Sequence, residues 1–269
     1  MIELYGNDNQ MMCDAIDNIL VKIHAYKKKT DAKSFLLTGC GAQAGTTTVS
    51  INLAIALSMA GWKTLLIDCD LRKGGRYKRV GAMQETGLTE YLSGECEYEK
   101  CIHDTNYENL KYLPNGKECK NPVRMICSAK MEEMVAKVAG AYDYIIYDMP
   151  SINAVADATI LFSQVDGVAL VAGIRKNTRR QIHDAKRKVA QMEAKYLGMI
   201  VNNVDEGQYK RYVRDYDYFS GKNMEKRNAE RIKKTAKNKI LEKDMTKNRT
   251  TEDTTEKKKK KGDRNGRKK

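Results

Sequence analysis

The sequence lacks several features of secreted and membrane proteins. It contains seven cysteines, an odd number, and no C-x-x-C pair, which disfavours a disulfide framework and paired-cysteine metal sites. No apolar run approaches the roughly 20 residues that a membrane-spanning helix needs. The first ten residues, MIELYGNDNQ, are polar and unlike a signal peptide. We therefore expect a cytoplasmic protein with reduced thiols.

Most of the chain also lacks an excess of positive charge. The formal net charge is +14, but residues 222–269 contain 20 Lys and Arg against 8 Asp and Glu, a net charge of +12, which leaves +2 for residues 1–221. A basic nucleic-acid-binding face on the folded part is therefore not expected. The tail composition is typical of disorder. Such a tail is either attracted to anionic lipid headgroups or is only a solubilising appendage.

Residues 35–72 have the pattern of a strand, a glycine-bearing turn, a helix and a second strand. The first apolar run stops at Gly39, a helical pattern covers residues 49–61, and the second strand ends in Asp68 and Asp70. A turn between a strand and a helix directs backbone N–H groups and the positive helix end towards one point, which suits a phosphate. Carboxylates at the end of the neighbouring parallel strand are well placed to hold a metal over that phosphate.

The glycine-bearing turn lacks the lysine of the phosphate-binding pattern G-x-x-x-x-G-K-[ST]. Gly45 and Thr47 match the last glycine and the hydroxyl residue, but Thr46 replaces the lysine and Cys40 replaces the first glycine. The turn alone is equally compatible with a nucleotide site and with a ligand-free connection. The candidate nucleotide-binding residues of the turn are Gly41, Ala44, Gly45, Thr46, Thr47 and Thr48.

Strands and helices alternate along the rest of the chain, which predicts an α/β fold with a doubly wound, mostly parallel sheet. Further strands are predicted at 109–113, 144–149, 167–171 and 197–203, and helices at 11–29, 87–94, 122–139 and 178–195. We divide the chain into a leading helix and linker (1–34), a nucleotide-binding-like domain (35–205), a tyrosine cluster (206–221) and a largely disordered basic tail (222–269).

Three further residues are expected at the carboxyl edge of the sheet, where open α/β folds bind ligands. Asp148 ends a strand of apolar and aromatic residues and is a candidate metal ligand. Arg72 follows Asp70 and would either steady phosphate charge or remain a solvated cation. Asn202 ends the last strand, where its amide would contact a nucleotide base or serve as an ordinary turn asparagine.

A cluster of four tyrosines follows the last predicted strand. Basic and acidic residues are interleaved with these tyrosines, and the segment has no apolar face to bury. From its composition the segment is compatible with a surface loop or with a stacking platform for nucleic acid. The four residues are Tyr209, Tyr212, Tyr216 and Tyr218.

The ordered set of motifs resembles the bacterial tyrosine kinases of capsule and exopolysaccharide loci, which are P-loop NTPases related to the ParA and MinD ATPases. The resemblance extends over about residues 11–218 and includes the tyrosine cluster. The segments that carry it are LLIDCDLRKG, GLTEYLSG, NLKYLPNG, NPVRMICSAKMEEMV, YDYIIYDMPS and DATILFSQVDGVALVAG.

The resemblance implies a protein-tyrosine kinase that uses ATP and Mg²⁺ and phosphorylates its own tyrosine cluster. Asp68 and Asp70 would help to hold the metal and take the proton from the attacking tyrosine. Asp148 and Thr47 would complete the metal ligands. Because phosphoryl transfer depends mainly on positioning and charge neutralisation, replacement of the lysine by Thr46 would slow the transfer.

The resemblance also implies a membrane polysaccharide co-polymerase (Wzz-like) as an activating partner, a homo-oligomer, and a location at the inner face of the plasma membrane. At the positions of the family's ring-forming pattern this chain carries Asp14, Asp17 and Leu20. Two alternatives stay open. One is a pseudokinase of the same fold with weak or no catalysis, and the other is a ParA- or MinD-like ATPase.

Overall fold

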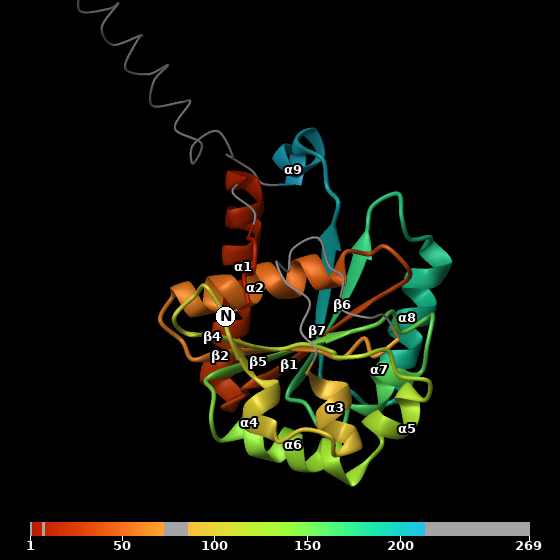
Figure 1. Cartoon of the computed structure of the whole chain (residues 1–269). Helices are drawn as coiled ribbons and strands as arrows, with labels where there is room; N and C mark the ends of the chain where they lie inside the picture. Colours follow the sequence, from red (N-terminus) through yellow and green to blue (C-terminus); the bar gives the residue numbers. More distant parts are fainter. Residues whose placement is uncertain (1, 7–8, 73–85, 213–269) are drawn as a thin grey trace, which may run out of the picture. The chain divides into compact units, whose positions relative to one another are not determined.

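The computed structural model describes residues 2–6, 9–72 and 86–212 (Figure 1). The chain divides into two compact units, residues 1–206 and 207–269. Tyr216, Tyr218, the basic loop that follows Arg72 and the basic tail lie outside the described residues. None of the helices in the described ranges combines the length and hydropathy needed to cross a bilayer.

The first unit is built on a seven-stranded sheet with the strand order β3-β4-β2-β5-β1-β6-β7. Every pairing in this sheet is parallel except that of β3 with β4. The predicted doubly wound, mostly parallel α/β fold is therefore confirmed. The strands are β1 Ser34–Gly39, β2 Thr64–Asp68, β3 His103–Asp104, β4 Leu110–Leu113, β5 Tyr144–Met149, β6 Gly167–Gly173 and β7 Tyr196–Asn202.

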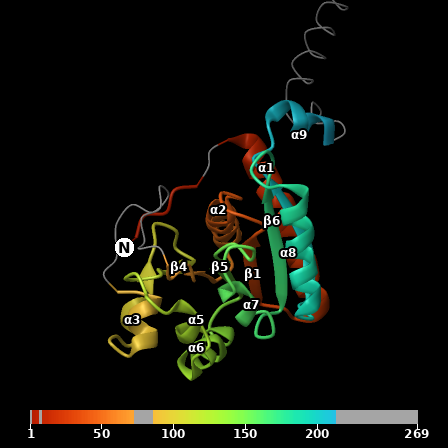
Figure 2. The same cartoon turned by 90° about the vertical axis from the view of Figure 1, so that its right-hand side faces the viewer.

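Helices cover both faces of the sheet (Figures 1 and 2). The apolar residues of α1 and α2 belong to the buried cluster on one face, and those of α3 to α8 belong to the cluster on the other. The helices of the first unit are α1 Gln10–Thr30, α2 Thr46–Met59, α3 Leu88–Ser93, α4 Tyr98–Cys101, α5 Pro122–Ile126, α6 Ala129–Ala139, α7 Asp157–Ile160 and α8 Arg179–Gln191.

Helix α2 has nine buried residues spread around its circumference, more than any other helix in the part of the chain that the structure describes. A helix that is apolar on all sides must be covered on all sides, and α2 lies between the sheet and α1. Ile16 and Ile23 of α1 are buried. The leading helix therefore packs on its own body, where it contacts α2.

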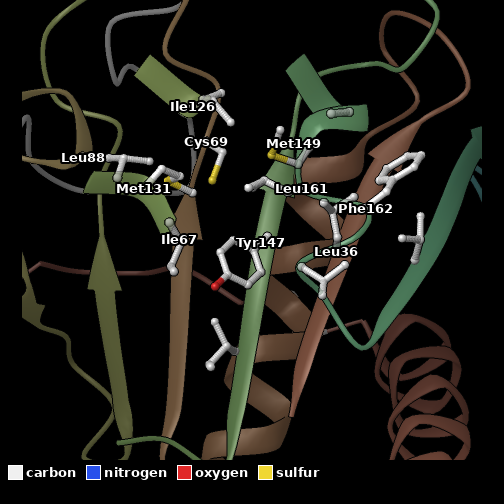
Figure 3. Packing of buried hydrophobic residues seen from close by; sticks show 14 of the residues in the cluster. Leu36, Ile67, Cys69, Leu88, Ile126, Met131, Tyr147, Met149, Leu161 and Phe162 are labelled. Carbon is white, nitrogen blue, oxygen red and sulfur yellow. The ribbon is translucent and has the colours of Figure 1, made fainter. Parts of the chain in front are cut away.

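The buried core on the face of the sheet opposite α2 determines which way the side chains at the ends of β2 and β5 point. Figure 3 shows the buried ring of Tyr147 together with Cys69 and Met149 in one apolar cluster. Successive side chains of a strand point to opposite faces. Asp68 and Asp148, which alternate with these apolar residues, therefore lie on the α2 side of the sheet.

One predicted helix is wrong, because residues 122–139 form two helices. Helix α5 ends at Ile126 and α6 begins at Ala129. The break occurs at Ser128, whose side chain accepts a hydrogen bond from the Met131 backbone N–H and caps α6. Pro122 lies in the first turn of α5, and the preceding Asn121 side chain makes no capping hydrogen bond.

The predicted end of the helix at 178–195 is also wrong. Helix α8 stops at Gln191, and Glu193 has a left-handed backbone with a φ of 51°. The residue at such a helix end is usually glycine, so the sequence carries no ordinary stop signal here. Met192, the residue after α8, is 48% exposed as a result.

The start of the tyrosine cluster is helical and is not a surface loop, one of the two alternatives considered for this segment. Tyr209 and Tyr212 lie in α9, Glu206–Tyr212, most of which belongs to the second unit. The sequence analysis also missed the two-residue strand β3. This strand runs antiparallel to β4, and the residue after it, Thr105, pairs with Ile2.

Candidate functional site

The turn between β1 and α2 has the backbone of an anion-binding loop. Gln43 and Gly45 adopt left-handed conformations, with φ values of 58° and 83°. Alternation of left-handed and ordinary residues turns successive N–H groups towards one side and forms a concave anion site. The positive end of α2 begins at the same place, where the side chains of Thr46, Thr47 and Thr48 are partly exposed. Residues 39–47 are called the phosphate loop below.

Two glycines of the phosphate loop are required by close contacts on its outer side. A Cβ atom at Gly41 would lie 2.6 Å from Asn177 Nδ2, and one at Gly45 would lie 2.1 Å from Asn202 Nδ2. Real Cβ atoms do not approach other atoms so closely. These glycines therefore allow side-chain amides to reach the loop backbone, and Gly45 also permits the left-handed turn.

Two carboxylates stand side by side at the carboxyl ends of β2 and β5. Asp68 and Asp148 are register partners in the parallel pair, and they are only 2% and 3% exposed. Ser50, in the second turn of α2, donates its hydroxyl hydrogen bond to Asp148 Oδ1 at 3.0 Å. The helix that begins at the phosphate loop therefore also orients one carboxylate of the pair.

The third predicted carboxylate, Asp70, is fixed next to this pair. Its backbone N–H donates to Asp68 Oδ1 at 3.0 Å, and its carbonyl accepts from Asn115 Nδ2 at 2.9 Å. Burial, followed by the charges of Asp68, Asp148 and Asp70, raises the pKa of the Cys69 thiol. The hydrogen bond to Asp68 holds Asp70 beside the pair at the end of β2.

The donor chemistry of these residues fits Mg²⁺ bound together with a nucleotide. Carboxylate and hydroxyl oxygens are the ligands that Mg²⁺ prefers, and the ion is usually held by one or two carboxylates plus substrate phosphates. Within the described ranges, no group of three or more His, Cys, Asp or Glu is placed to hold a metal ion by itself. The carboxylates would share the ion with phosphate rather than enclose it.

Arg72 is paired with a carboxylate although its own side chain is partly exposed. Its Nε and Nη2 atoms bind the two carboxylate oxygens of Asp157 at 2.8 and 3.0 Å. Asp157 begins α7 and its side chain is 1% exposed. The hydrogen bonds to Asp157 raise the pKa of the Arg72 guanidinium. Arg72 therefore connects the end of β2 to the segment after β5.

The last β-strand residue, Asn202, contacts the phosphate loop itself. Its Nδ2 donates to the Ala44 carbonyl at 3.0 Å. Two other asparagines that the sequence analysis missed, Asn153 and Asn177, make similar contacts with the loop. They carry no motif that marks them in the sequence, because each comes from a different loop and only the fold brings them together.

Comparisons with known proteins agree with this geometry. A family model described as an AAA domain matches residues 41–171. The chain is 39% identical over 165 residues to "Tyrosine-protein kinase CpsD" of Streptococcus agalactiae, a match that covers 60% of this chain and 71% of the relative. The kinase domain of the Escherichia coli tyrosine kinase ETK superposes with a TM-score of 0.69 at 27% identity, covering 72% of this chain and 76% of that one.

A more distant structure shares the fold alone. The septum site-determining protein MinD of Pyrococcus horikoshii, complexed with Mg-ADP, superposes with a TM-score of 0.52 at 21% identity, covering 66% of this chain and 76% of that chain. The parallel sheet, the phosphate loop and the paired carboxylates are thus found together with close sequence similarity to kinases. The chain belongs to the bacterial tyrosine-protein kinase family of capsule and exopolysaccharide biosynthesis, whose members have a P-loop NTPase fold.

Proposed function

We propose that the protein is an ATP-dependent protein-tyrosine kinase that phosphorylates its own tyrosine cluster and regulates capsule or exopolysaccharide synthesis. The single observation that carries this proposal is the register pair of Asp68 and Asp148, buried at the strand ends beside the phosphate loop. Buried carboxylates are costly to maintain, and their oxygens are suited to a metal-bound nucleotide. A ligand-free connection has no need of them.

Each group of residues has a separate task in this proposal. The backbone N–H groups of the phosphate loop would bind phosphate oxygens, and the Thr47 hydroxyl would bind the metal together with Asp68 and Asp148. Asp70 would accept the proton of the attacking tyrosine. When bound, Mg²⁺ supplies the positive charge that neutralises the phosphates. The proposed phosphoacceptors are Tyr209, Tyr212, Tyr216 and Tyr218.

Thr46 supports a second candidate, a pseudokinase that acts as a regulatory subunit. A preorganised group of the kind that the missing lysine supplies is worth about 10²–10³ in rate. Nucleotide binding depends less on this lysine, because the backbone donors and the carboxylates are still present. The two candidates therefore share a binding step and differ in phosphoryl transfer.

Calorimetric titration of the purified chain with Mg-ATP and Mg-ADP tests the shared step. We expect metal-dependent binding in the micromolar range that Asp148→Asn abolishes and that Asp17→Asn, an exposed change on α1, leaves intact. Absence of binding up to millimolar nucleotide would refute the kinase proposal for this chain. If binding is observed, mass spectrometry of the four tyrosines after incubation with Mg-ATP separates the kinase from the pseudokinase.

The partners proposed here rest on family membership and on charge. A membrane polysaccharide co-polymerase would activate the kinase at the inner face of the membrane, and a second copy of the chain would supply or receive the tyrosines. The net charge of +12 over residues 222–269 supports attraction to anionic lipid, since each basic residue near such a surface contributes about 1 kcal/mol. Co-sedimentation with anionic vesicles, compared with a chain truncated at residue 221, tests the membrane contact.

A further inference from the structure

Three asparagine side chains donate hydrogen bonds to alternate carbonyl groups of the phosphate loop. Asn153 Nδ2 donates to the Cys40 carbonyl at 2.8 Å, Asn177 Nδ2 to the Ala42 carbonyl at 3.4 Å, and Asn202 Nδ2 to the Ala44 carbonyl at 3.0 Å. Asn153 follows β5, Asn177 follows β6, and Asn202 ends β7. Three separate segments of the fold therefore converge on one loop.

Each of these asparagines is itself anchored to the body of the domain. Asn153 Nδ2 also donates to the Gln181 carbonyl in α8 at 2.7 Å. The Oδ1 atom of Asn177 accepts from the Gly173 backbone N–H at 2.8 Å. Asn202 pairs with Gly173 in the sheet. Through these contacts the phosphate loop is connected to α8, β6 and β7.

These contacts determine which way the loop's N–H groups face. The peptide bonds of the loop are trans, and in a trans peptide the carbonyl of one residue points opposite to the N–H of the next. With the carbonyls of residues 40, 42 and 44 directed at the asparagines, the N–H groups of Gly41, Gln43 and Gly45 face the other side. The left-handed backbone at Gln43 and Gly45 curves the loop, so that these N–H groups line a concave site.

We propose that Asn153, Asn177 and Asn202 are positioning residues that hold the phosphate loop in its anion-binding shape before nucleotide arrives. The identification of the loop's ligand as a nucleotide phosphate rests on the proposed function. The three asparagine hydrogen bonds to the loop, which we call the asparagine clamp, do not depend on it. Backbone N–H donors that are already oriented need no reorganisation when an anion binds. This matters more in a loop that has Thr46 in place of lysine, because the backbone donors then carry the phosphate contacts.

The clamp can be tested without nucleotide through the Cys40 thiol. Cys40 lies in the loop with no exposed surface, and its carbonyl is the acceptor for Asn153. Local opening of the loop would expose the thiol to a maleimide, and peptide mass spectrometry would follow its labelling. Cys69, equally buried at the end of β2, reports global opening in the same sample.

Asn153→Asp and Asn202→Asp replace an amide donor by a carboxylate of the same shape that repels the carbonyl. The matched control is Asn203→Asp, which places the same charge one residue away on an exposed side chain whose φ of 58° aspartate tolerates. Loss of one hydrogen bond should speed Cys40 labelling about five- to tenfold. Cys69 labelling should stay unchanged, and the control should behave as wild type.

The outcomes separate the clamp from the proposed function. Cys40 labelling within twofold of wild type in both variants overturns the clamp, and so does equal acceleration of Cys69, because the asparagines would then support the whole fold. In calorimetry, Asn202→Asp should weaken Mg-ADP binding about tenfold, more than Asn203→Asp does. If the wild type binds no nucleotide while the Cys40 effect persists, the clamp stands and the proposed function fails.

Discussion

Removal of the Arg72 side chain should destabilise the first unit more than removal of its partner, Asp157. The guanidinium binds both carboxylate oxygens of Asp157, at 2.8 and 3.0 Å. The two partners differ in exposure, because the Asp157 side chain is 1% exposed and that of Arg72 is 41% exposed. Arg72→Ala would therefore leave a buried carboxylate, whereas Asp157→Ala would leave a cation that water already reaches.

The difference in exposure sets the size of each effect. Breaking a fully buried ion pair costs about 3–5 kcal/mol, whereas exposed pairs contribute about 0–1 kcal/mol. Because the Arg72 side is partly solvated, we expect a cost of about 2 kcal/mol for Arg72→Ala. Asp157→Ala should cost about 1 kcal/mol. Arg72→Lys, which keeps the charge but loses the two-point geometry, should fall between wild type and Arg72→Ala.

Urea unfolding followed by tryptophan fluorescence measures these differences. The chain has one tryptophan, Trp62, and its ring lies 5.9 Å from that of Tyr144 in the core next to α2. Fluorescence therefore reports unfolding of the first unit. A double-mutant cycle with Arg72→Ala and Asp157→Ala isolates the pair. Equal losses for the two single variants, or a loss below about 0.5 kcal/mol for Arg72→Ala, would refute the reasoning.

Three further predictions concern the phosphate loop and the residues around it. Thr46→Lys should raise the rate of tyrosine phosphorylation by about 10²–10³, measured with labelled ATP, and an unchanged rate would show that more than the lysine is missing. Ser50→Ala removes the donor to Asp148 and should lower the free energy of unfolding by about 1–2 kcal/mol in the urea assay, where no change would contradict it. Burial raises the pKa of Cys40 to about 11, so its alkylation should still increase between pH 9 and pH 10 while remaining slower than that of the exposed Cys127. A plateau below pH 9 would contradict the burial of this thiol.

The fold was predictable because its signals are local and repeated. Apolar runs such as residues 144–149 read as buried strands, and the helix between Thr46 and Met59 is apolar on every side. Alternation of such segments leaves few topologies other than a parallel sheet with helices on both faces. The placement of Asp68 and Asp148 at one edge followed from the same rule, since carboxyl ends of parallel strands share an edge.

The errors arose where a side chain acts on a distant backbone or where a usual signal is absent. The break before α6 depends on Ser128, one serine among other polar residues, and the end of α8 depends on Glu193 rather than on glycine. The pairing of Arg72 with Asp157 joins residues 85 positions apart. No local pattern specifies such a contact, so the two alternatives expected for Arg72, a phosphate contact or a solvated cation, did not include it.

The arrangement of charge explains how a site without the lysine can still be a nucleotide site. Asp148, which accepts a hydrogen bond from Ser50 of α2, and its register partner Asp68 place negative charge beside the helix that begins at the phosphate loop, and Arg72 is committed to Asp157. A nucleotide phosphate would be repelled by these carboxylates unless a cation arrives with it. Binding should therefore depend more steeply on Mg²⁺ than in a site where a lysine is present, because the metal is then the main source of positive charge. The replacement by Thr46 thus makes the retained carboxylates more important for binding, and this is the physical reason to expect a nucleotide site rather than a vestige.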